Sequence, residues 1–193
     1  MGAQVTAVRT PTTASAISAV ILSLWSSVIG GAPTQLALAV LTTQIDVETG
    51  WANCWNYNVG NLVPSGGSNY VVVSGIQLRA FTSFQDGVTA FLALLKARYS
   101  AALASAAIGD LAGYAANLRA QGYYTATEAS YLALLQARYP ADAAAVVTVP
   151  APASPASPAS SPAATSSGSG GSLVALLLVT AGALYVATRT GRA

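Results

Sequence analysis

The segment of residues 45–62, IDVETGWANCWNYNVGNL, concentrates side chains that could do chemistry. It combines Glu48 with two tryptophans, a tyrosine and four asparagines, whereas the remaining chain is dominated by Ala, Leu, Val, Ser and Thr. A carboxylic acid can transfer a proton, aromatic rings offer flat apolar faces with polar edges, and amides both donate and accept hydrogen bonds. Aromatic platforms combined with amides are typical of sites that hold an uncharged sugar chain.

Glu48 is expected at the end of a helix, on its apolar side. The residues at i, i+3, i+4 and i+7 of this helix are Leu41, Gln44, Ile45 and Glu48. Burial and the negative end of the helix dipole both favour the neutral carboxyl, so we expect a raised pKa for Glu48. A carboxyl that stays protonated can donate its proton to a leaving oxygen. Asp46 lies about 200° further round the helix and should point elsewhere.

Histidine is absent from the chain, and Cys54 is its one cysteine. Histidine is the commonest general base near neutral pH and the commonest zinc ligand, so we expect no metal and no cofactor. A thiol nucleophile needs a partner base, so we expect Cys54 to be a small packing residue. A structural alternative for residues 45–62 is a capped helix followed by an asparagine-rich turn, with the aromatic rings in the core.

The stretch ETGWANCWNYNVGNL resembles the helix-end signature of bacterial cell-wall glucosaminidases and lysozyme-like lytic transglycosylases. In that signature, E-T/S-G is followed by N-x-x-N-[VIL]-G-N. Two later pieces, FTSFQDGVTAFLALL and AGYAANLRAQGYYTATEASY, are similar to segments that follow in the same order in the family. The resemblance covers about residues 14–140.

This resemblance implies a lysozyme-like α fold that cleaves β-1,4 bonds of peptidoglycan glycan strands. It makes Glu48 the catalytic acid, and it places Tyr123 or Tyr124 of the GYYT segment in the cleft. The candidate substrate-binding residues are Trp51, Trp55, Asn56, Tyr57, Asn58, Asn61, Tyr123 and Tyr124.

A second carboxylate is missing where a two-carboxylate glycosidase would need one. Such an enzyme places its second acid about 5–9.5 Å from the first. No acid occurs between Glu48 and Asp86, and Asp86 has the sequence context of a helix cap. We therefore expect a single-acid mechanism in which the N-acetyl group or the 6-hydroxyl group of the sugar is the nucleophile. The 6-hydroxyl route would make the enzyme a lytic transglycosylase with 1,6-anhydro products.

Residues 1–147 are expected to form one small, mainly α-helical domain with one β-hairpin. Six basic and six acidic residues leave this part neutral, so nucleic acid is not an expected partner. The hairpin is predicted within residues 61–82. The expected helices run from Pro33 at N1 to Glu48, over residues 86–99, from an Asp110 cap to Gly122, and from a Thr125–Glu128 capping box to Pro140.

Residues 14–32 form a further apolar stretch without charge. Helical spacing of its apolar residues favours a domain helix. The alternative is the apolar region of a signal peptide, for which cleavage after Ala32 would leave Pro33 as an unfavourable first residue.

The composition changes after residue 147. Residues 148–172 lack charge and large apolar side chains, which predicts a flexible Pro/Ala/Ser/Gly-rich linker. Residues 173–188 are apolar and are expected to form a single transmembrane helix, followed by a short basic tail at 189–193. The expected partners are therefore peptidoglycan and a lipid bilayer.

The expected setting is a phage virion with an internal membrane, where a tethered enzyme would open the cell wall during entry. A bacterial inner-membrane enzyme facing the periplasm, which remodels the wall, is the alternative. Two other classes stay open: a non-catalytic glycan-binding module on a membrane tether, and a structural membrane protein or pore former.

Overall fold

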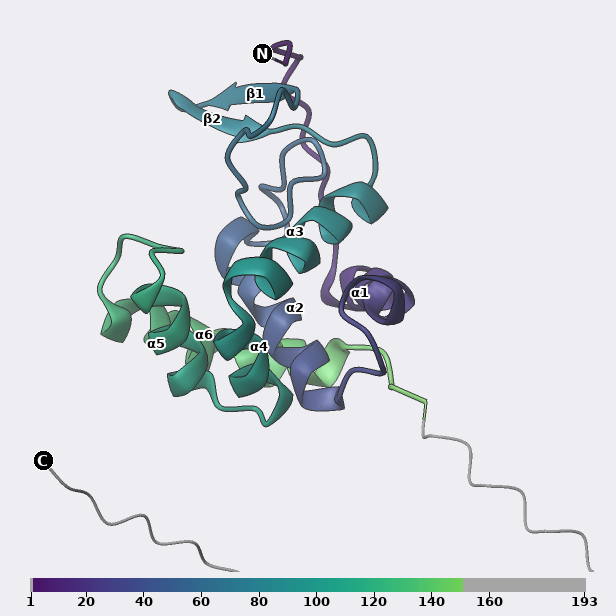
Figure 1. Ribbon diagram of the computed structural model, residues 1–193, viewed down its shortest axis with the longest axis vertical. Coiled ribbons are helices and arrows are strands. Elements are labelled where there is room, and N and C mark those ends of the chain that lie inside the picture. Colours follow the sequence, from purple (N-terminus) through teal and green to yellow (C-terminus); the bar gives the residue numbers. More distant parts are fainter. Residues whose placement is uncertain (1, 151–193) are drawn as a thin grey trace, which may run out of the picture. The chain divides into compact units, whose positions relative to one another are not determined.

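A computed structural model describes residues 2–150 of the chain. These residues form a mainly helical domain of six helices with one antiparallel hairpin (Figure 1), which confirms the predicted class. The elements are α1 (Ala14–Val28), α2 (Gln35–Thr49), β1 (Tyr70–Val73), β2 (Ile76–Arg79), α3 (Phe84–Arg98), α4 (Ser100–Ala107), α5 (Leu111–Ala120) and α6 (Glu128–Ala145). The predicted transmembrane helix, the basic tail and the linker beyond residue 150 lie outside the described residues.

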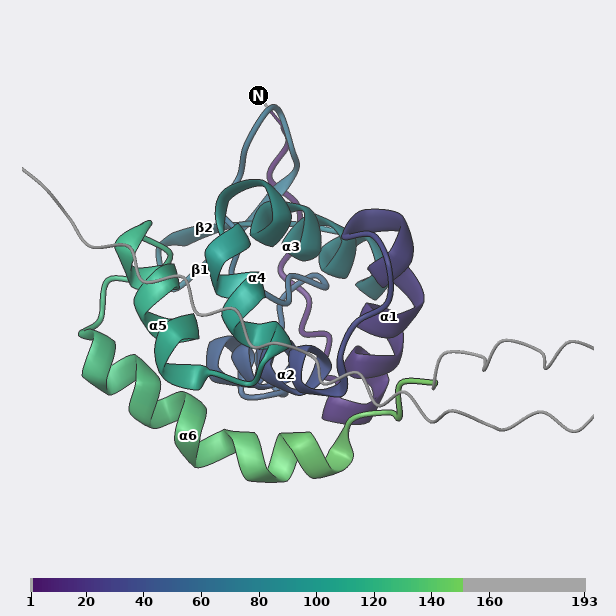
Figure 2. The same ribbon diagram turned by 60° about the horizontal axis from the view of Figure 1, so that its bottom comes forward.

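Helix α2 is the central element of the domain, with α1, α4 and α6 packed against it (Figures 1 and 2). Every residue from 37 to 46 is buried, so this helix is covered on all sides rather than along one stripe. The first two residues of the helix, Gln35 and Leu36, are exposed, and in its last turn Val47 and Glu48 are partly exposed. The helix therefore delivers Glu48 from the centre of the core to its edge.

Helix α1 supplies Ile17, Ile21 and Trp25 to the core and packs against α2 and α3. It begins at a Thr13 cap, whose hydroxyl accepts a hydrogen bond from the amide of Ala16. Residues 14–28 therefore form a helix of the domain, which is the alternative that the sequence favoured. Across residues 2–150, no helix has both the length and the apolar character needed to cross a membrane.

The helix boundaries predicted at Pro33 and Pro140 were wrong. Pro33 is not the first residue of α2, because Thr34 is the N-cap and accepts a hydrogen bond from the amide of Ala37. Pro140 does not end α6, which continues to Ala145. A proline leaves the carbonyl four residues earlier without its helical donor, here that of Gln136. Both residues are exposed, so water can satisfy that carbonyl.

The other helix starts also depend on single side chains. Thr127, not Thr125, caps α6 by accepting a hydrogen bond from the amide of Ser130. Ser83 caps α3, so Asp86 lies in the first turn of that helix rather than at its cap. Asp110 caps α5, as predicted. Helix α4 was not predicted, since its alanine-rich sequence carries little periodic signal.

The hairpin pairs Tyr70 with Arg79 and Val73 with Ile76 around a Ser74–Gly75 turn, within the predicted range of residues 61–82. The N-terminal segment runs alongside it, with a bridge between Gln4 and Tyr70. Figure 1 shows this segment passing from the hairpin to the start of α1. The N-terminal segment also lies along the loop of residues 50–62, which connects α2 to the hairpin region.

Candidate active site around Glu48

The Glu48 carboxyl lies at the C-terminal end of α2 between two hydrogen-bond donors from distant parts of the chain. Tyr131 of α6 donates its hydroxyl hydrogen to Oε1 at 3.0 Å. Asn61 donates from Nδ2 to Oε2 at 3.1 Å and to the Glu48 backbone carbonyl at 2.9 Å. One carboxyl is therefore held by a helix on one side and by a loop on the other, which fixes its orientation.

Burial raises the pKa of Glu48 above its ordinary value of 4.5. The hydrogen bonds from Tyr131 and Asn61 oppose this shift because they stabilise the ionised form. The expectation of a raised pKa is thus met, with burial as the leading cause. Each carboxyl oxygen has a second lone pair, so the proton can remain on the group while both bonds are kept.

Three tyrosine hydroxyls surround this carboxyl inside the domain. The pKa values of Tyr114, Tyr123 and Tyr131 are all raised, first by burial and then by the negative charge of Glu48. These hydroxyls therefore stay neutral and act as donors. The Tyr114 hydroxyl is bonded to Oε1 of Gln44, one helical turn before Glu48. Gln44 is thus part of a buried polar network beneath the acid.

An open pocket of about 350 Å³ adjoins the carboxyl through Asn61. Its lining includes Asn61, Arg79, Leu94, Arg98, Tyr99 and Tyr123. The volume is within the range of small-molecule and single-sugar sites. Glu48 itself lies behind Asn61 rather than on the pocket wall, one hydrogen bond away.

The loop between α2 and the hairpin is held in an unusual backbone conformation. Trp51, Asn56, Tyr57 and Asn61 all have positive φ angles, between 46° and 61°. Asparagine adopts this region more readily than other residues with side chains, so the strain falls mainly on Trp51 and Tyr57, at on the order of 1–3 kcal/mol each. Such strain persists where the surroundings impose it, and it gathers at functional sites. It supports a functional rather than an incidental role for this loop.

Two of the predicted asparagines have their amides occupied within the fold. Asn58 is buried, accepts a hydrogen bond from the amide of Leu62 and donates to the carbonyls of Leu62 and Arg79. Asn56 accepts from the amide of Val8 and donates to the carbonyl of Thr6. These two amides join the loop to the hairpin and to the N-terminal segment. Among the predicted asparagines, Asn61 is the one that contacts Glu48.

The predicted aromatic residues of the loop lie apart from one another. Trp51 packs against the core and faces the carboxyl of Asp142. Trp55 stacks beneath the guanidinium of Arg9, which lies 5.0 Å from its ring centroid. Tyr57 packs edge-on against Phe84 at 5.1 Å. None of the three lines the pocket beside Asn61.

The two tyrosines of the GYYT segment both lie near Glu48, in different roles. Tyr123 lines the pocket, donates to the carbonyl of Gly60 at 3.0 Å and packs edge-on against Tyr99. Tyr124 stacks on Tyr131 with ring centroids 3.9 Å apart, and so braces the tyrosine that holds Glu48. Tyr131 was missed as a site residue by sequence reasoning, although it belongs to the segment that carried the resemblance.

The remaining carboxylates of the described residues lie elsewhere. Asp46 pairs with Arg138 of α6 at 2.7 Å, so it points away from Glu48 as predicted. Asp86 accepts hydrogen bonds from Thr82 and Ser83, which hold its pKa below the ordinary value. Neither lines the pocket beside Asn61.

Cys54 is fully buried, and burial raises the pKa of its thiol. This position fits a packing residue rather than a thiolate nucleophile.

The three comparisons with protein families, curated proteins and solved structures returned no match to this chain.

Proposed function

We propose that this protein is a peptidoglycan-cleaving glycosidase with a lysozyme-like fold, and that Glu48 is its catalytic acid. The observation that carries the proposal is the arrangement of Glu48 itself. A carboxyl of raised pKa lies at the end of a buried helix, held by Tyr131 and Asn61, beside an open pocket. A general acid for glycoside cleavage needs these properties, because it must be protonated and positioned before it meets the leaving oxygen.

In the proposed reaction, Glu48 transfers its proton to the glycosidic oxygen as the bond from that oxygen to C1 breaks. The carboxylate left behind is stabilised by the donors from Tyr131 and Asn61, which favour the ionised form. These two bonds thus strengthen as negative charge develops on Glu48. Their energetic contribution is larger after proton transfer than before it, which is the condition for accelerating the step.

A single-acid mechanism fits the distribution of carboxylates. No Asp or Glu of residues 2–150 lines the pocket beside Asn61, and Glu48 is the one carboxyl joined to it by a hydrogen bond, through Asn61. We propose that the 6-hydroxyl oxygen of the sugar attacks C1 and that its proton passes to the Glu48 carboxylate. The products are a 1,6-anhydro sugar and a free 4-hydroxyl group, and no water is consumed. This route would class the enzyme as a lytic transglycosylase; attack by the N-acetyl group, as in some glucosaminidases, would give reducing ends.

The test is digestion of purified peptidoglycan by the wild type and by Glu48→Gln. We expect the variant to lose about 10²–10⁴-fold in rate, the usual contribution of a general acid. Glu128→Gln is the matched control, because Glu128 is exposed at the start of α6 and the chemical change is the same. Unchanged clearing by Glu48→Gln would reject the proposal. If that variant and the wild type both bound peptidoglycan without cleaving it, the domain would be a glycan-binding module.

Mass analysis of the released fragments tests the chemistry separately. Anhydro sugars are expected at the new ends. Reducing ends alone would reject the 6-hydroxyl route while leaving Glu48 as the acid.

We further propose that the domain acts on a membrane tether, with residues 173–188 in the bilayer and the enzyme facing the cell wall. This part of the proposal rests on the sequence alone. A virion membrane is the favoured location, and a bacterial inner membrane is the alternative. Flotation of the full chain with liposomes, compared with a chain ending at residue 150, tests it. Equal recovery of both chains in the lipid fraction would contradict a C-terminal anchor.

A further inference from the structure

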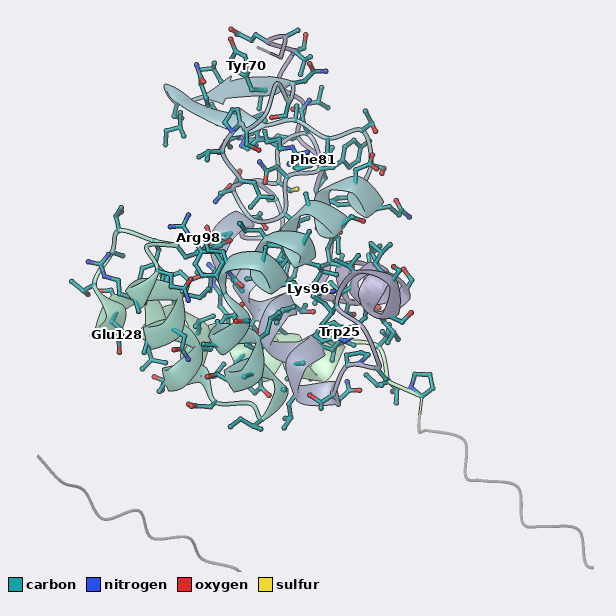
Figure 3. All side chains as sticks on the ribbon, viewed as in Figure 1. Trp25, Tyr70, Phe81, Lys96, Arg98 and Glu128 are labelled. Atoms are coloured by element: carbon teal, nitrogen blue, oxygen red, sulfur yellow. The ribbon has the colours of Figure 1, made fainter. Side chains whose placement is uncertain are left out.

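The pocket beside Asn61 is lined by two arginines and by no carboxylate. Arg79, at the end of β2, and Arg98, at the end of α3, both contribute to its lining. They come from separate elements. Figure 3 shows Arg98 on the part of α3 that faces α5, whereas Lys96 lies on the part that faces α1. The pocket is therefore positively charged although the domain as a whole is neutral.

Neither arginine has an ionic partner among residues 2–150, where Arg138 and Asp46 form the one ion pair. Arg98 donates from Nη2 to the carbonyl of Gln121 at 2.8 Å and lies over the ring of Tyr99. Arg79 lies over the ring of Phe81 at 4.8 Å. A guanidinium has five N–H donors, so most donors of both groups are left for solvent or for a ligand.

Two guanidinium groups are more than a neutral sugar requires. Hydroxyl and N-acetyl groups are held by amides and aromatic faces, whereas the planar fork of arginine matches a carboxylate with two parallel hydrogen bonds. Peptidoglycan differs from an uncharged amino-sugar polymer in the lactyl ether of every second sugar. That ether ends either in a free carboxylate or in a stem peptide that carries carboxylates of its own.

We propose that Arg79 and Arg98 bind a carboxylate of the glycan strand and thereby make the pocket specific for a muramic acid unit. This inference rests on the proposed function, since it names the substrate feature recognised beside the same acid. Asn61 connects the two parts of the site, because it lines the pocket and donates to Glu48. Binding a muramic unit in the pocket would fix the register of the strand relative to Glu48.

The experiment is calorimetric titration of full-length protein carrying Glu48→Gln, so that no ligand is consumed. Three tetrasaccharides are compared: neutral chitotetraose, an alternating glucosamine–muramic oligosaccharide with free lactyl carboxylates, and the same oligosaccharide with stem peptides attached. Arg79→Gln and Arg98→Gln are each expected to weaken binding of a carboxylate-bearing ligand about tenfold or more, since each removes charge-assisted hydrogen bonds. Binding of chitotetraose should change less than about twofold.

Lys96→Gln is the matched control. It removes one positive charge from the same helix as Arg98, and its ammonium likewise donates to a backbone carbonyl, that of Val28. Lys96 does not line the pocket, so all three affinities should be unchanged. If Arg79→Gln fails to fold, Arg79→Lys replaces it, because lysine keeps the positive charge but lacks the planar guanidinium. This variant is expected to lose an intermediate amount of affinity for the same ligands.

The inference would be overturned if the arginine variants lost the same binding affinity for chitotetraose as for the carboxylate-bearing ligands. It would also be overturned if they lost affinity for neither. A selective loss with the free lactyl form identifies the ether carboxylate as the ligand, and one confined to the peptide form identifies a stem-peptide carboxylate. Failure of the proposed function has a different signature: Glu48→Gln would keep lytic activity whatever the arginine variants do.

Discussion

Tyr131 donates its hydroxyl hydrogen to Oε1 of Glu48 at 3.0 Å, across 83 positions of sequence. The donor belongs to α6 and the acceptor to α2, the two helices that form the largest helix contact of the domain. Tyr131 is buried and is itself stacked on Tyr124. The ionisation of Glu48 is therefore coupled to the docking of the last helix.

Replacing Tyr131 by Phe should raise the pKa of Glu48 further, because a hydrogen bond that favours the carboxylate is lost. In the proposed mechanism Glu48 acts in its protonated form, so the alkaline limb of kcat/KM on peptidoglycan should move to higher pH. The maximal rate should fall about 10- to 150-fold, since the carboxylate formed in the proposed reaction loses a donor worth roughly 1.5–3 kcal/mol. An unshifted alkaline limb would show that Tyr131 does not act on Glu48.

The charge of Glu48 should lower the stability of the fold at neutral pH. Its pKa in the folded state is above the unfolded value of 4.5, so stability is lost as the pH rises from about 4.5 through the raised value. Glu48→Gln cannot titrate and should lose less stability over that range. The measurement is the difference in unfolding temperature between variant and wild type, which should be more positive at pH 8 than at pH 4. Glu128→Gln, with an exposed carboxyl, should show no such increase.

Asp142 should give a second pH-dependent loss of stability. Burial and the negative charge of Asp46 raise its pKa from 3.8 to about 6, while Thr43, Arg138 and Trp51 act in the opposite sense. Ionisation therefore costs stability between pH 4 and 6, and Asp142→Asn should stabilise the domain above pH 6 but not below pH 4. Solvent screening reduces the expected gain to on the order of 1 kcal/mol. Denaturant unfolding at pH 3.5 and pH 7.5 measures it.

Asp86→Asn is a control for the Asp142→Asn experiment, because its effect on stability should have the opposite sign. Bonds from Thr82 and Ser83 lower the pKa of Asp86, so its stabilising effect is present at neutral pH and is lost as the pH falls through 3.8 and below. The substitution should therefore destabilise the domain at pH 7.5 and have less effect at low pH. If both variants changed stability equally at the two pH values, neither assignment would stand.

Asn58 and Asn61 should separate stability from activity. Asn58→Ala removes three hydrogen bonds, two of them buried and one partly buried, and should cost about 3 kcal/mol of unfolding free energy. Asn61→Ala removes the bonds to Glu48 at a partly exposed position, so it should cost about 1 kcal/mol and reduce the lytic rate about tenfold. Chemical unfolding and peptidoglycan turnover, measured on both variants, check this. A reversed pattern would assign the substrate contacts to Asn58.

Several parts of the site could be predicted from local sequence. The i, i+3, i+4, i+7 spacing placed Glu48 at the end of a buried face, and the 200° offset directed Asp46 away from it. Burial of that face was enough to give the direction of the pKa shift. The hairpin turn and the Asp110 cap also followed from local rules, because each depends on neighbours within four residues.

Other parts depended on contacts between distant segments. Pro140 suggested a helix end, but the tertiary position of α6 carries the helix through it. The sequence does not distinguish the amides of Asn56, Asn58 and Asn61. The hydrogen-bond partner of each one in the fold decides whether it has a structural role or belongs to the candidate site. Opposite Asn56 is the N-terminal segment, opposite Asn58 the hairpin, and opposite Asn61 the acid.

The sequence by itself determined that a lone glutamate would end a buried helix beside a cluster of aromatics and amides. Only the tertiary structure decided which of those groups meet it. Tyr131 reaches Glu48 because α6 docks on α2, and Arg79 and Arg98 line one pocket because the end of β2 and the end of α3 both border it. Periodicity fixes the side of a helix on which a residue lies, whereas its partners are set by packing between elements far apart in the chain.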